Sequence, residues 1–159
     1  MATVSKITPC LWFDDRGEEA ANFYVNIFKN SRVKEIVRYP ADSPGPEGSV
    51  MLVLFELDGH EFTALNGGPQ FTFDEAVSFE VRCKDQAEID YFWDRLTEDG
   101  GQESVCGWVK DKFGLSWQVV PEGLYEMASD PAKFARAAKA VWGMKKIDIA
   151  EIERAANGS

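Results

Sequence analysis

The stretch "VRCKDQAEIDYFWDRL", residues 81–96, decides the fold because it repeats in physical terms an earlier stretch, "LWFDDRGEEAANFYVNIF", residues 11–28. Each stretch contains an aspartate followed three positions later by a glutamate. The two pairs are Asp15 with Glu18 and Asp85 with Glu88. This spacing is typical of a capping box, in which the two side chains satisfy free backbone N–H groups where a helix begins. We therefore predict a helix start in each stretch.

Each predicted helix carries one apolar stripe and follows a strand-like run. The stripes are Ala20, Phe23, Tyr24 and Ile27 in the first copy, and Ile89, Phe92, Trp93 and Leu96 in the second. Their spacing is that of a helix with one buried face. The runs "ITPCLWF" (7–13) and "SFEVRC" (78–83) precede the two caps. Each copy therefore begins with a strand, a cap and a helix.

Strand candidates follow both helices. After the first come residues 31–39, 49–57 and 61–66, and after the second come residues 102–110 and 115–121. The pair Asp58-Gly59 predicts a tight hairpin, and "DKFG" supplies a turn in the second copy. The second copy is more compressed, so its middle strands must be short. The predicted order is βαβββ twice.

A helical annex follows the two copies. Asp130-Pro131 is a typical helix start, with Gly143 as a natural stop, and a second helix opens at Asp148 with Glu151 as its capping partner. The expected buried stripe of the first helix is Phe134, Ala138, Val141 and Trp142, and Ile147 with Ile152 form a hydrophobic staple. These helices pack either against the sheets or across a dimer.

These patterns predict an α+β fold in two parts. The first is a domain of residues 1–125 that contains two modules, at about 5–67 and 76–121. The second is a C-terminal helical extension of residues 126–159.

The composition indicates a compact soluble protein of 159 residues with a net charge of −10. This charge argues against nucleic acid and anionic membranes as partners. Such acidity serves solubility or attracts cationic ligands. The start "MATVSKITPCLWF" lacks an export signal and no run is long enough to cross a bilayer, so we expect a cytoplasmic location. The three cysteines (Cys10, Cys83 and Cys106) are expected to be reduced thiols.

Three phrases carry a resemblance to a known family. "LNGGPQFTFDEAVSFEV", "DRLTEDGG" and "CGWVKDKFGLSWQVVP", in this order, resemble the PhnB-like branch of the glyoxalase/bleomycin-resistance/dioxygenase (vicinal oxygen chelate) superfamily. This branch is also called 3-demethylubiquinone 3-methyltransferase-like. The resemblance runs from about residue 7 to residue 121. It implies a glyoxalase-like fold, in which two βαβββ modules curl their sheets around a cleft, usually in homodimers.

The resemblance also implies where a divalent metal would bind in members that use one. The implied positions are Thr8, Phe62, Ser78 and Gln118. Zinc, nickel and iron prefer imidazole, thiolate or carboxylate, and among these four only Gln118 is even a weak donor. The sole histidine, His60, lies beside the predicted hairpin turn and is expected to be exposed. We therefore predict neither metal nor cofactor, which disfavours metal-dependent glyoxalase or ring-cleaving dioxygenase activity.

The methyltransferase label has no support in the residues. A methyl donor built on adenosine usually binds at a glycine-rich turn between a strand and a helix, and Gly67-Gly68 is followed by Pro69 and a linker instead. No cysteine has a histidine to activate it, so no catalytic residue is assigned.

Strand alternation predicts the side chains that face the implied cleft. In the first strand, Ile7, Leu11 and Phe13 suit the helix-packed side, so Thr8, Cys10 and Trp12 face the cleft. The corresponding residues of the other strands are Phe62, Ala64 and Asn66; Ser78, Glu80 and Arg82; and Ser116, Gln118 and Val120. The predicted ligand-binding set is Trp12, Glu80, Arg82, Asn66, Ser116 and Gln118. Trp108 and Lys110 alternate onto one face and could join the rim, although the expected role of Trp108 is packing in the core or across a dimer.

Glu80 and Arg82 have two interpretations. They pair with each other or across a dimer, or they orient a polar ligand over the Trp12 ring, with Arg82 as a planar donor fork and Glu80 as an acceptor.

The sequence thus favours a homodimer that binds a small molecule without a required metal, with sequestration as the mechanism. Phe71, Phe73 and Trp108 are the aromatic residues expected to be covered on dimerisation. An uncharacterised enzyme of the same superfamily, a lyase, isomerase or transferase acting on a small polar metabolite, is the alternative. A structural role in an assembly is the third. The ligand is not identified by the sequence.

Overall fold

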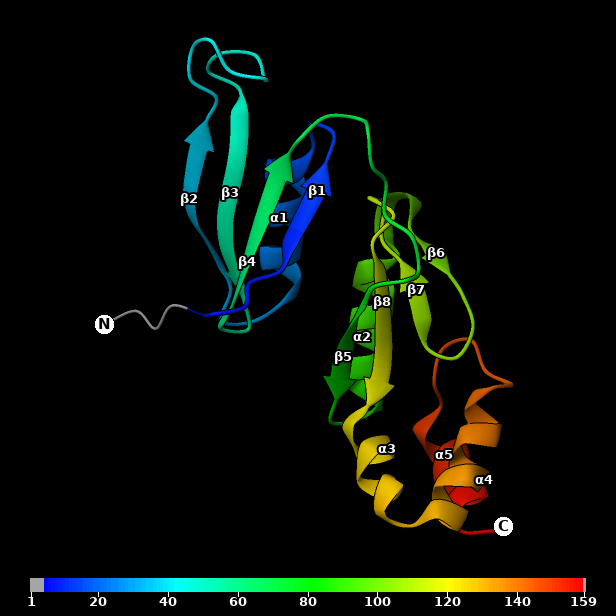
Figure 1. The fold of residues 1–159 in the computed structure, drawn as a ribbon. Coiled ribbons are helices and arrows are strands. Elements are labelled where there is room, and N and C mark those ends of the chain that lie inside the picture. The colour runs from blue at the N-terminus through cyan, green and yellow to red at the C-terminus, as the bar shows by residue number, and fades with distance from the viewer. Residues whose placement is uncertain (1–4, 159) are drawn as a thin grey trace. The chain divides into compact units, whose positions relative to one another are not determined.

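The computed structural model describes residues 5–158 of the chain. The chain divides into two compact units, Met1–Thr72 and Phe73–Ser159, and each unit has its own four-stranded sheet (Figure 1). The outer limits of the predicted domains, at 1 and 159, and the first four residues of the start discussed above lie outside the described residues.

The first unit has the predicted βαβββ order. Its elements are β1 (Cys10–Phe13), α1 (Gly17–Ile27), β2 (Arg32–Arg38), β3 (Val50–Leu57) and β4 (His60–Asn66). The sheet order is β1-β4-β3-β2, in which β1 runs parallel to β4 and the other neighbours are antiparallel. The hairpin between β3 and β4 is the predicted one, since Asp58 and Gly59 both have positive φ, at 48° and 78°.

The second unit repeats this topology. Its module consists of β5 (Ser78–Cys83), α2 (Gln86–Leu96), a short 3-10 turn (Glu98–Gly100), β6 (Gln102–Glu103), β7 (Trp108–Lys110) and β8 (Ser116–Pro121). The sheet order is β5-β8-β7-β6, again with the first and last strands parallel. The internal repeat and the α+β class are confirmed. The predicted run 102–110 is interrupted, because the chain leaves the sheet after two residues and Cys106 and Gly107 adopt positive φ.

Each sheet packs one face against its helix. In the first unit the ring of Phe55 stacks on Tyr24 of α1, with centroids 6.4 Å apart, and on Phe62 at 5.5 Å. In the second unit the buried residues of α2 (Ile89, Trp93 and Leu96) are accompanied by buried Val81, Trp117 and Val119 on the strands. Each such side chain contributes about 1.5–3 kcal/mol by leaving water. The opposite face of each sheet carries no helix of its own module.

The two helices begin differently. Asp85 accepts a hydrogen bond from the N–H of Glu88 at 2.9 Å, and the Glu88 carboxylate accepts from the N–H of Lys84 at 2.9 Å, which confirms the second capping box. At α1 the N-cap residue is Arg16, and it makes no side-chain capping hydrogen bond, so the predicted box of Asp15 with Glu18 is wrong. The N–H of Gly17 instead donates to Asn66 Oδ1 of β4 at 2.7 Å.

The C-terminal annex belongs to the second unit and consists of α3 (Glu122–Glu126), a 3-10 turn (Met127–Ser129), α4 (Pro131–Val141) and α5 (Ile149–Ala156). Both predicted caps form, since Asp130 accepts from Lys133 N at 3.1 Å and Asp148 from Glu151 N at 3.2 Å.

The expected stripe on α4 is wrong in two places. Phe134 and Trp142 are exposed, and Ala137 with Val141 forms the buried face instead. Gln86 of α2 joins the annex to the module, because its amide donates to the carbonyl of Ile147 at 2.9 Å and accepts from the N–H of Ile149 at 2.9 Å. The annex therefore packs beside α2. Within residues 5–158, no helix has both the length and the apolar character needed to cross a membrane.

Candidate functional site

Polar and aromatic side chains share the helix-free face of the second sheet. The strand register places Glu80 opposite Gln118, Ser78 opposite Ser116, and Trp108 opposite Gln118. Lys110 lies opposite Ser116 on one side and Gln102 on the other. Paired residues of neighbouring strands point to the same face, so the predicted common orientation of these residues is confirmed. The Gln118 amide donates to the Ser78 hydroxyl at 3.0 Å.

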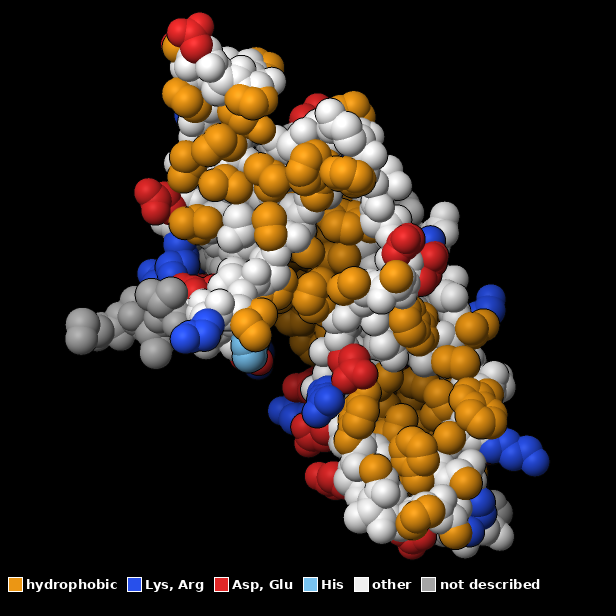
Figure 2. All heavy atoms as spheres, in the orientation of Figure 1, with side chains coloured by type: hydrophobic (Ala, Val, Ile, Leu, Met, Phe, Trp, Pro, Cys, Tyr) orange, Lys and Arg blue, Asp and Glu red, His pale blue; other side chains and the backbone are white. Residues whose placement is uncertain are grey.

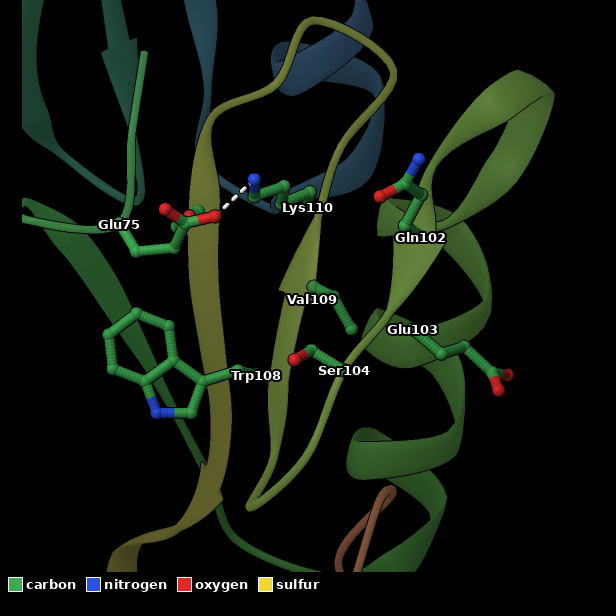
Figure 3. A pocket seen from close by; sticks show the side chains of 8 residues that line it. Glu75, Gln102, Glu103, Ser104, Trp108, Val109 and Lys110 are labelled. Atoms are coloured by element: carbon green, nitrogen blue, oxygen red, sulfur yellow. Dashed lines mark ion pairs between the residues drawn. The ribbon is translucent and has the colours of Figure 1, made fainter.

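A pocket of about 210 Å³ lies on this sheet where β6, β7 and β8 meet the segment that precedes β5 (Figure 3). Its lining residues are Glu75, Gln102, Glu103, Ser104, Trp108, Val109, Lys110 and Ser116. Ser116 belongs to the predicted binding set. Lys110 lines the pocket as the rim alternative allows, and Trp108 lines it too, although packing was its expected role.

Ser116 is the most unusual residue of the pocket. It is 0% exposed, and its hydroxyl has no hydrogen-bond partner among residues 5–158. A buried hydroxyl without a partner destabilises a protein by about 1–3 kcal/mol. The hydroxyl is covered in this structure, so a ligand reaches it only when a side chain that covers it moves aside.

Two residues of the lining, Lys110 and Glu75, form an ion pair (Figure 3). The hydrogen bond from Lys110 holds the pKa of the Glu75 carboxyl below its ordinary value. The other acidic residue of the lining, Glu103, is engaged elsewhere, because its carboxylate accepts from the indole N–H of Trp93 at 3.0 Å. In Figure 3 the Glu103 side chain points away from Lys110 and Trp108.

Glu80 and Arg82 pair with each other on β5. The ion pair measures 3.1 Å, and the Arg82 guanidinium lies 4.1 Å from the centroid of the Tyr125 ring on α3. Burial and a hydrogen bond to Glu80 raise the pKa of Tyr125 to about 12. The first of the two interpretations of this pair therefore describes the structure. Contact of the pair with a ligand stays a prediction.

The expected orientation of Asn66 is wrong. Asn66 points to the helix side of the first sheet, where its oxygen accepts from Gly17 and its amide donates to the carbonyl of Val50 at 3.1 Å. Phe62 and Ala64 are buried on the same side, against the prediction. The register explains this side, because Ala64 lies opposite Leu11 and Asn66 opposite Phe13, both of which are buried on the helix side.

Trp12 lies on the helix-free side, opposite Leu65, as predicted. Its indole N–H donates to the carbonyl of Gly68 at 2.9 Å, and the ring of Phe71 meets it edge-on at 5.0 Å. A Cβ at Gly67 would lie 2.4 Å from the indole, so only glycine lets the backbone approach this ring. Trp12 therefore packs on the start of its own inter-module linker, and stacking on a ligand stays a prediction.

The positions implied for a metal do not fit one. Phe62 faces the helix, and Ser78 and Gln118 are hydrogen-bonded to each other. Thr8 and Ile7 lie outside β1, so the strand orientation expected for both is wrong. The Thr8 hydroxyl donates to the carbonyl of Ser5 at 3.3 Å, and Ile7 is exposed rather than packed on the helix. In the part of the chain that the structure describes, no three His, Cys, Asp or Glu side chains are grouped as metal ligands. His60 is exposed at the hairpin, as expected.

The amino-acid sequence contains no pattern that would identify three of the pocket residues as part of a site. Glu75 lies in a turn between the modules, where no periodicity predicts a direction. Gln102 and Ser104 lie in the run 102–110, whose pattern predicts one strand although the chain leaves the sheet after Glu103.

Two βαβββ units, each with its first strand parallel to its last, define the glyoxalase/bleomycin-resistance (vicinal oxygen chelate) class of protein. A family model described as 3-demethylubiquinone-9 3-methyltransferase matches residues 5–120, and the chain belongs to this family.

Solved structures agree with this placement. A Bacillus cereus protein described as a 3-demethylubiquinone-9 3-methyltransferase, PhnB protein, is 36% identical over 73% of this chain and 99% of its own, with a TM-score of 0.66. A Pseudomonas aeruginosa protein is 20% identical over 74% of this chain and 98% of its own, with a TM-score of 0.60. An Arabidopsis thaliana gene product is 18% identical over 76% and 100%, with a TM-score of 0.51. The last two show the fold alone. No curated protein matches the chain.

Proposed function

We propose that this protein binds a small molecule in the pocket of its second unit and sequesters it. The observation that carries the proposal is the Ser116 hydroxyl, which is fully buried, without a partner among the described residues, and part of the lining of a pocket of about 210 Å³. A pocket with an aromatic wall and a few convergent polar groups is the usual form of a small-molecule site. Trp108 supplies the wall, and Lys110 with Ser116 supplies the polar groups.

Binding in this proposal requires no metal. The four positions at which the superfamily would hold one carry a phenyl ring, two hydroxyls and an amide, and the Ser78 hydroxyl and Gln118 amide already bond to each other. Such donors are poor ligands for zinc, nickel or iron.

Methyl transfer is not carried over from the family description. The connections from strand to helix, where an adenosine-based donor would be held by glycines, read Asp14-Asp15-Arg16 in the first unit and Lys84-Asp85 in the second.

Sequestration is favoured over catalysis because the acidic residues of the pocket are already engaged. Glu75 pairs with Lys110, and Glu103 accepts from Trp93. A carboxyl whose pKa is lowered by an ion pair is a weak general base, since proton transfer is most efficient when the pKa lies near the working pH. Burial raises the pKa of both Cys10 and Cys83, which disfavours their thiolate forms as nucleophiles.

A thermal-shift screen of metabolites and antibiotics, followed by calorimetry, tests the proposal. Trp108→Ala should weaken binding of each hit by about ten-fold or more, because an aromatic wall contributes more than 1 kcal/mol. Trp142→Ala is the matched control, since Trp142 is 71% exposed on the annex and outside the pocket. Mass spectrometry of the ligand after long incubation should find it unchanged.

Two outcomes would contradict the proposal in different ways. Equal loss of affinity in both tryptophan variants, or none in either, would place binding outside the pocket. Conversion of the ligand, lost in the Trp108 variant, would replace sequestration by catalysis.

A further inference from the structure

We propose that the pocket takes a small carboxylate with an apolar body, and that Glu75 is an intramolecular stand-in for the ligand's carboxylate. This inference rests on the proposed function and names the class of ligand.

Three hydrogen-bond donors of the pocket lining lie side by side on neighbouring strands. Gln102 of β6 pairs with Lys110 of β7, and Lys110 pairs with Ser116 of β8. Side chains at such directly opposite positions have Cβ atoms about 4.5–5.5 Å apart. A carboxylate has two oxygens and about four acceptor sites, so one such group can accept from Lys110 and Ser116 together. This arrangement would also satisfy the Ser116 hydroxyl, which lacks a partner among residues 5–158.

The two partners of the ion pair between Lys110 and Glu75 are held to different degrees. Lys110 lies on β7 between two paired strands, and its side chain is 36% exposed. Glu75 lies in a turn outside the sheet, and its side chain is 59% exposed. A ligand that separates the two displaces Glu75 and leaves Lys110 in place. The group that then remains to bind the ligand is the Lys110 ammonium. Because this group is a cation, it favours an anionic ligand.

A cationic ligand fits this row less well, although the chain as a whole is acidic. It would have to compete with Lys110 for Glu75 while lying beside the Lys110 charge, because Glu103 already accepts from Trp93. Like charges in direct contact repel each other.

The body of the ligand follows from the position of Trp108. Trp108 lies two residues before Lys110 on the same strand, so both side chains point to the same face about 6–7 Å apart. A carboxylate held by Lys110 places a short apolar or aromatic body against the indole. The class is therefore a compact aromatic or branched carboxylic acid that fits about 210 Å³.

Calorimetry with three probes of similar shape tests which charge a ligand must carry to bind in the pocket. Benzoate, benzamide and benzylamine carry a carboxylate, a neutral amide and an ammonium group on the same ring. At physiological ionic strength, benzoate should bind at least about ten-fold more tightly than either other probe, since a charge-assisted hydrogen bond is about twice as strong as a neutral one.

Two variants, each with a matched control, test whether the ligand's carboxylate displaces Glu75 from Lys110. Lys110→Gln should weaken benzoate binding about ten-fold or more, because the only cation of the pocket lining is lost. Glu75→Gln should strengthen it about three-fold, because an exposed ion pair no longer competes. Lys139→Gln and Glu47→Gln make the same changes of net charge at exposed positions outside the pocket and should leave benzoate affinity unchanged.

Each contrary result has a definite meaning. Benzamide or benzylamine binding as tightly as benzoate would overturn the carboxylate class while pocket binding stands. Identical benzoate affinities for Glu75→Gln and Glu47→Gln would overturn the stand-in role of Glu75. Failure of all three probes would overturn the whole inference, and the library screen with Trp108→Ala would then decide separately whether the pocket binds anything.

Discussion

Side chains on one face of the second sheet differ in how far the protein itself satisfies them. On β5, Glu80 and Arg82 form an ion pair that Tyr125 supports from α3. On β8, Ser116 is buried without a partner among the described residues, although it lies only one strand away. A polar group that the fold satisfies stabilises the protein, whereas a buried group without a partner costs stability that a ligand's hydrogen bond would restore.

Ser116→Ala should separate these two roles. The change removes a buried hydroxyl that no described group satisfies, so the free energy of unfolding should not fall and should rise by up to about 1 kcal/mol. Affinity for a pocket ligand should fall in the same variant. Urea unfolding and calorimetry check the two effects. A loss of stability of 1 kcal/mol or more would show that the hydroxyl is a structural group.

Tyr125 should make the protein less stable at high pH. Its folded pKa is about 12 against an ordinary value of 10.0, so the folded state keeps its proton longer than the unfolded state. The stability from this group is complete below about pH 10 and is lost as the pH rises toward about 12. Urea unfolding over this range measures the slope, and Tyr125→Phe should reduce it.

Glu80→Gln provides the second half of the same test. It removes the carboxylate that raises the pKa of Tyr125, so the phenol should titrate at a lower pH in absorbance measurements. An unchanged titration would show that burial alone causes the shift.

At the scale of elements, the helices α1 and α2 are preceded by the same capping signal, an aspartate followed three positions later by a glutamate. The signal forms a cap at only one of them. Asp85 is followed by Glu88 and forms a cap, whereas Asp15 is followed by Glu18 and does not. The difference is tertiary, because Asn66 reaches from β4 to the first N–H of α1. The local and long-range solutions satisfy the same requirement of a helix start.

Asp85→Ala and Asp15→Ala are therefore a matched pair. The first should lower the free energy of unfolding by about 1 kcal/mol, the usual effect of losing an N-cap, and the second should have almost no effect. Denaturant unfolding of both variants measures the difference. Equal losses would contradict the assignment of the α1 cap to Asn66.

At the scale of the whole molecule, apolar surface remains in the first unit. Val37, Leu52 and Leu65 form a cross-strand row on the helix-free side of its sheet, and Figure 2 shows hydrophobic side chains gathered over β2, β3 and β4. Phe71 is 65% exposed beside Trp12. Extended apolar patches of this kind are typical of surfaces that associate.

We therefore propose that the protein is a homodimer, and expect sedimentation at micromolar concentration to find a species of twice the chain mass of 17.8 kDa. Phe71→Ser should weaken association by about ten-fold, since burial of a phenylalanine side chain contributes about 1.5–3 kcal/mol. Val105→Ser, at another exposed apolar position, is the control. A single 17.8 kDa species for the unmodified chain would contradict the dimer.

The sequence by itself determined the repeat, the order of strands and helices, three of the four predicted capping pairs and the Asp58-Gly59 turn. These features depend on contacts within a few residues, where spacing and side-chain chemistry act directly. It also placed Glu80, Arg82, Ser116 and Gln118 on one face, because alternation along a regular strand is a local property.

Only the tertiary structure decided which of these polar side chains the protein itself satisfies and which lack a partner among the described residues. Asn66 faces the helix because the β1–β4 register pairs it with Phe13, and no local pattern specifies a register between strands so far apart in the chain. Trp12 packs on its own linker, and Glu75 reaches Lys110 from a turn without periodicity. The pocket depends on long-range pairing, which brings together Gln102, Lys110 and Ser116 from three strands, and so its polar groups converge only once the sheet has formed.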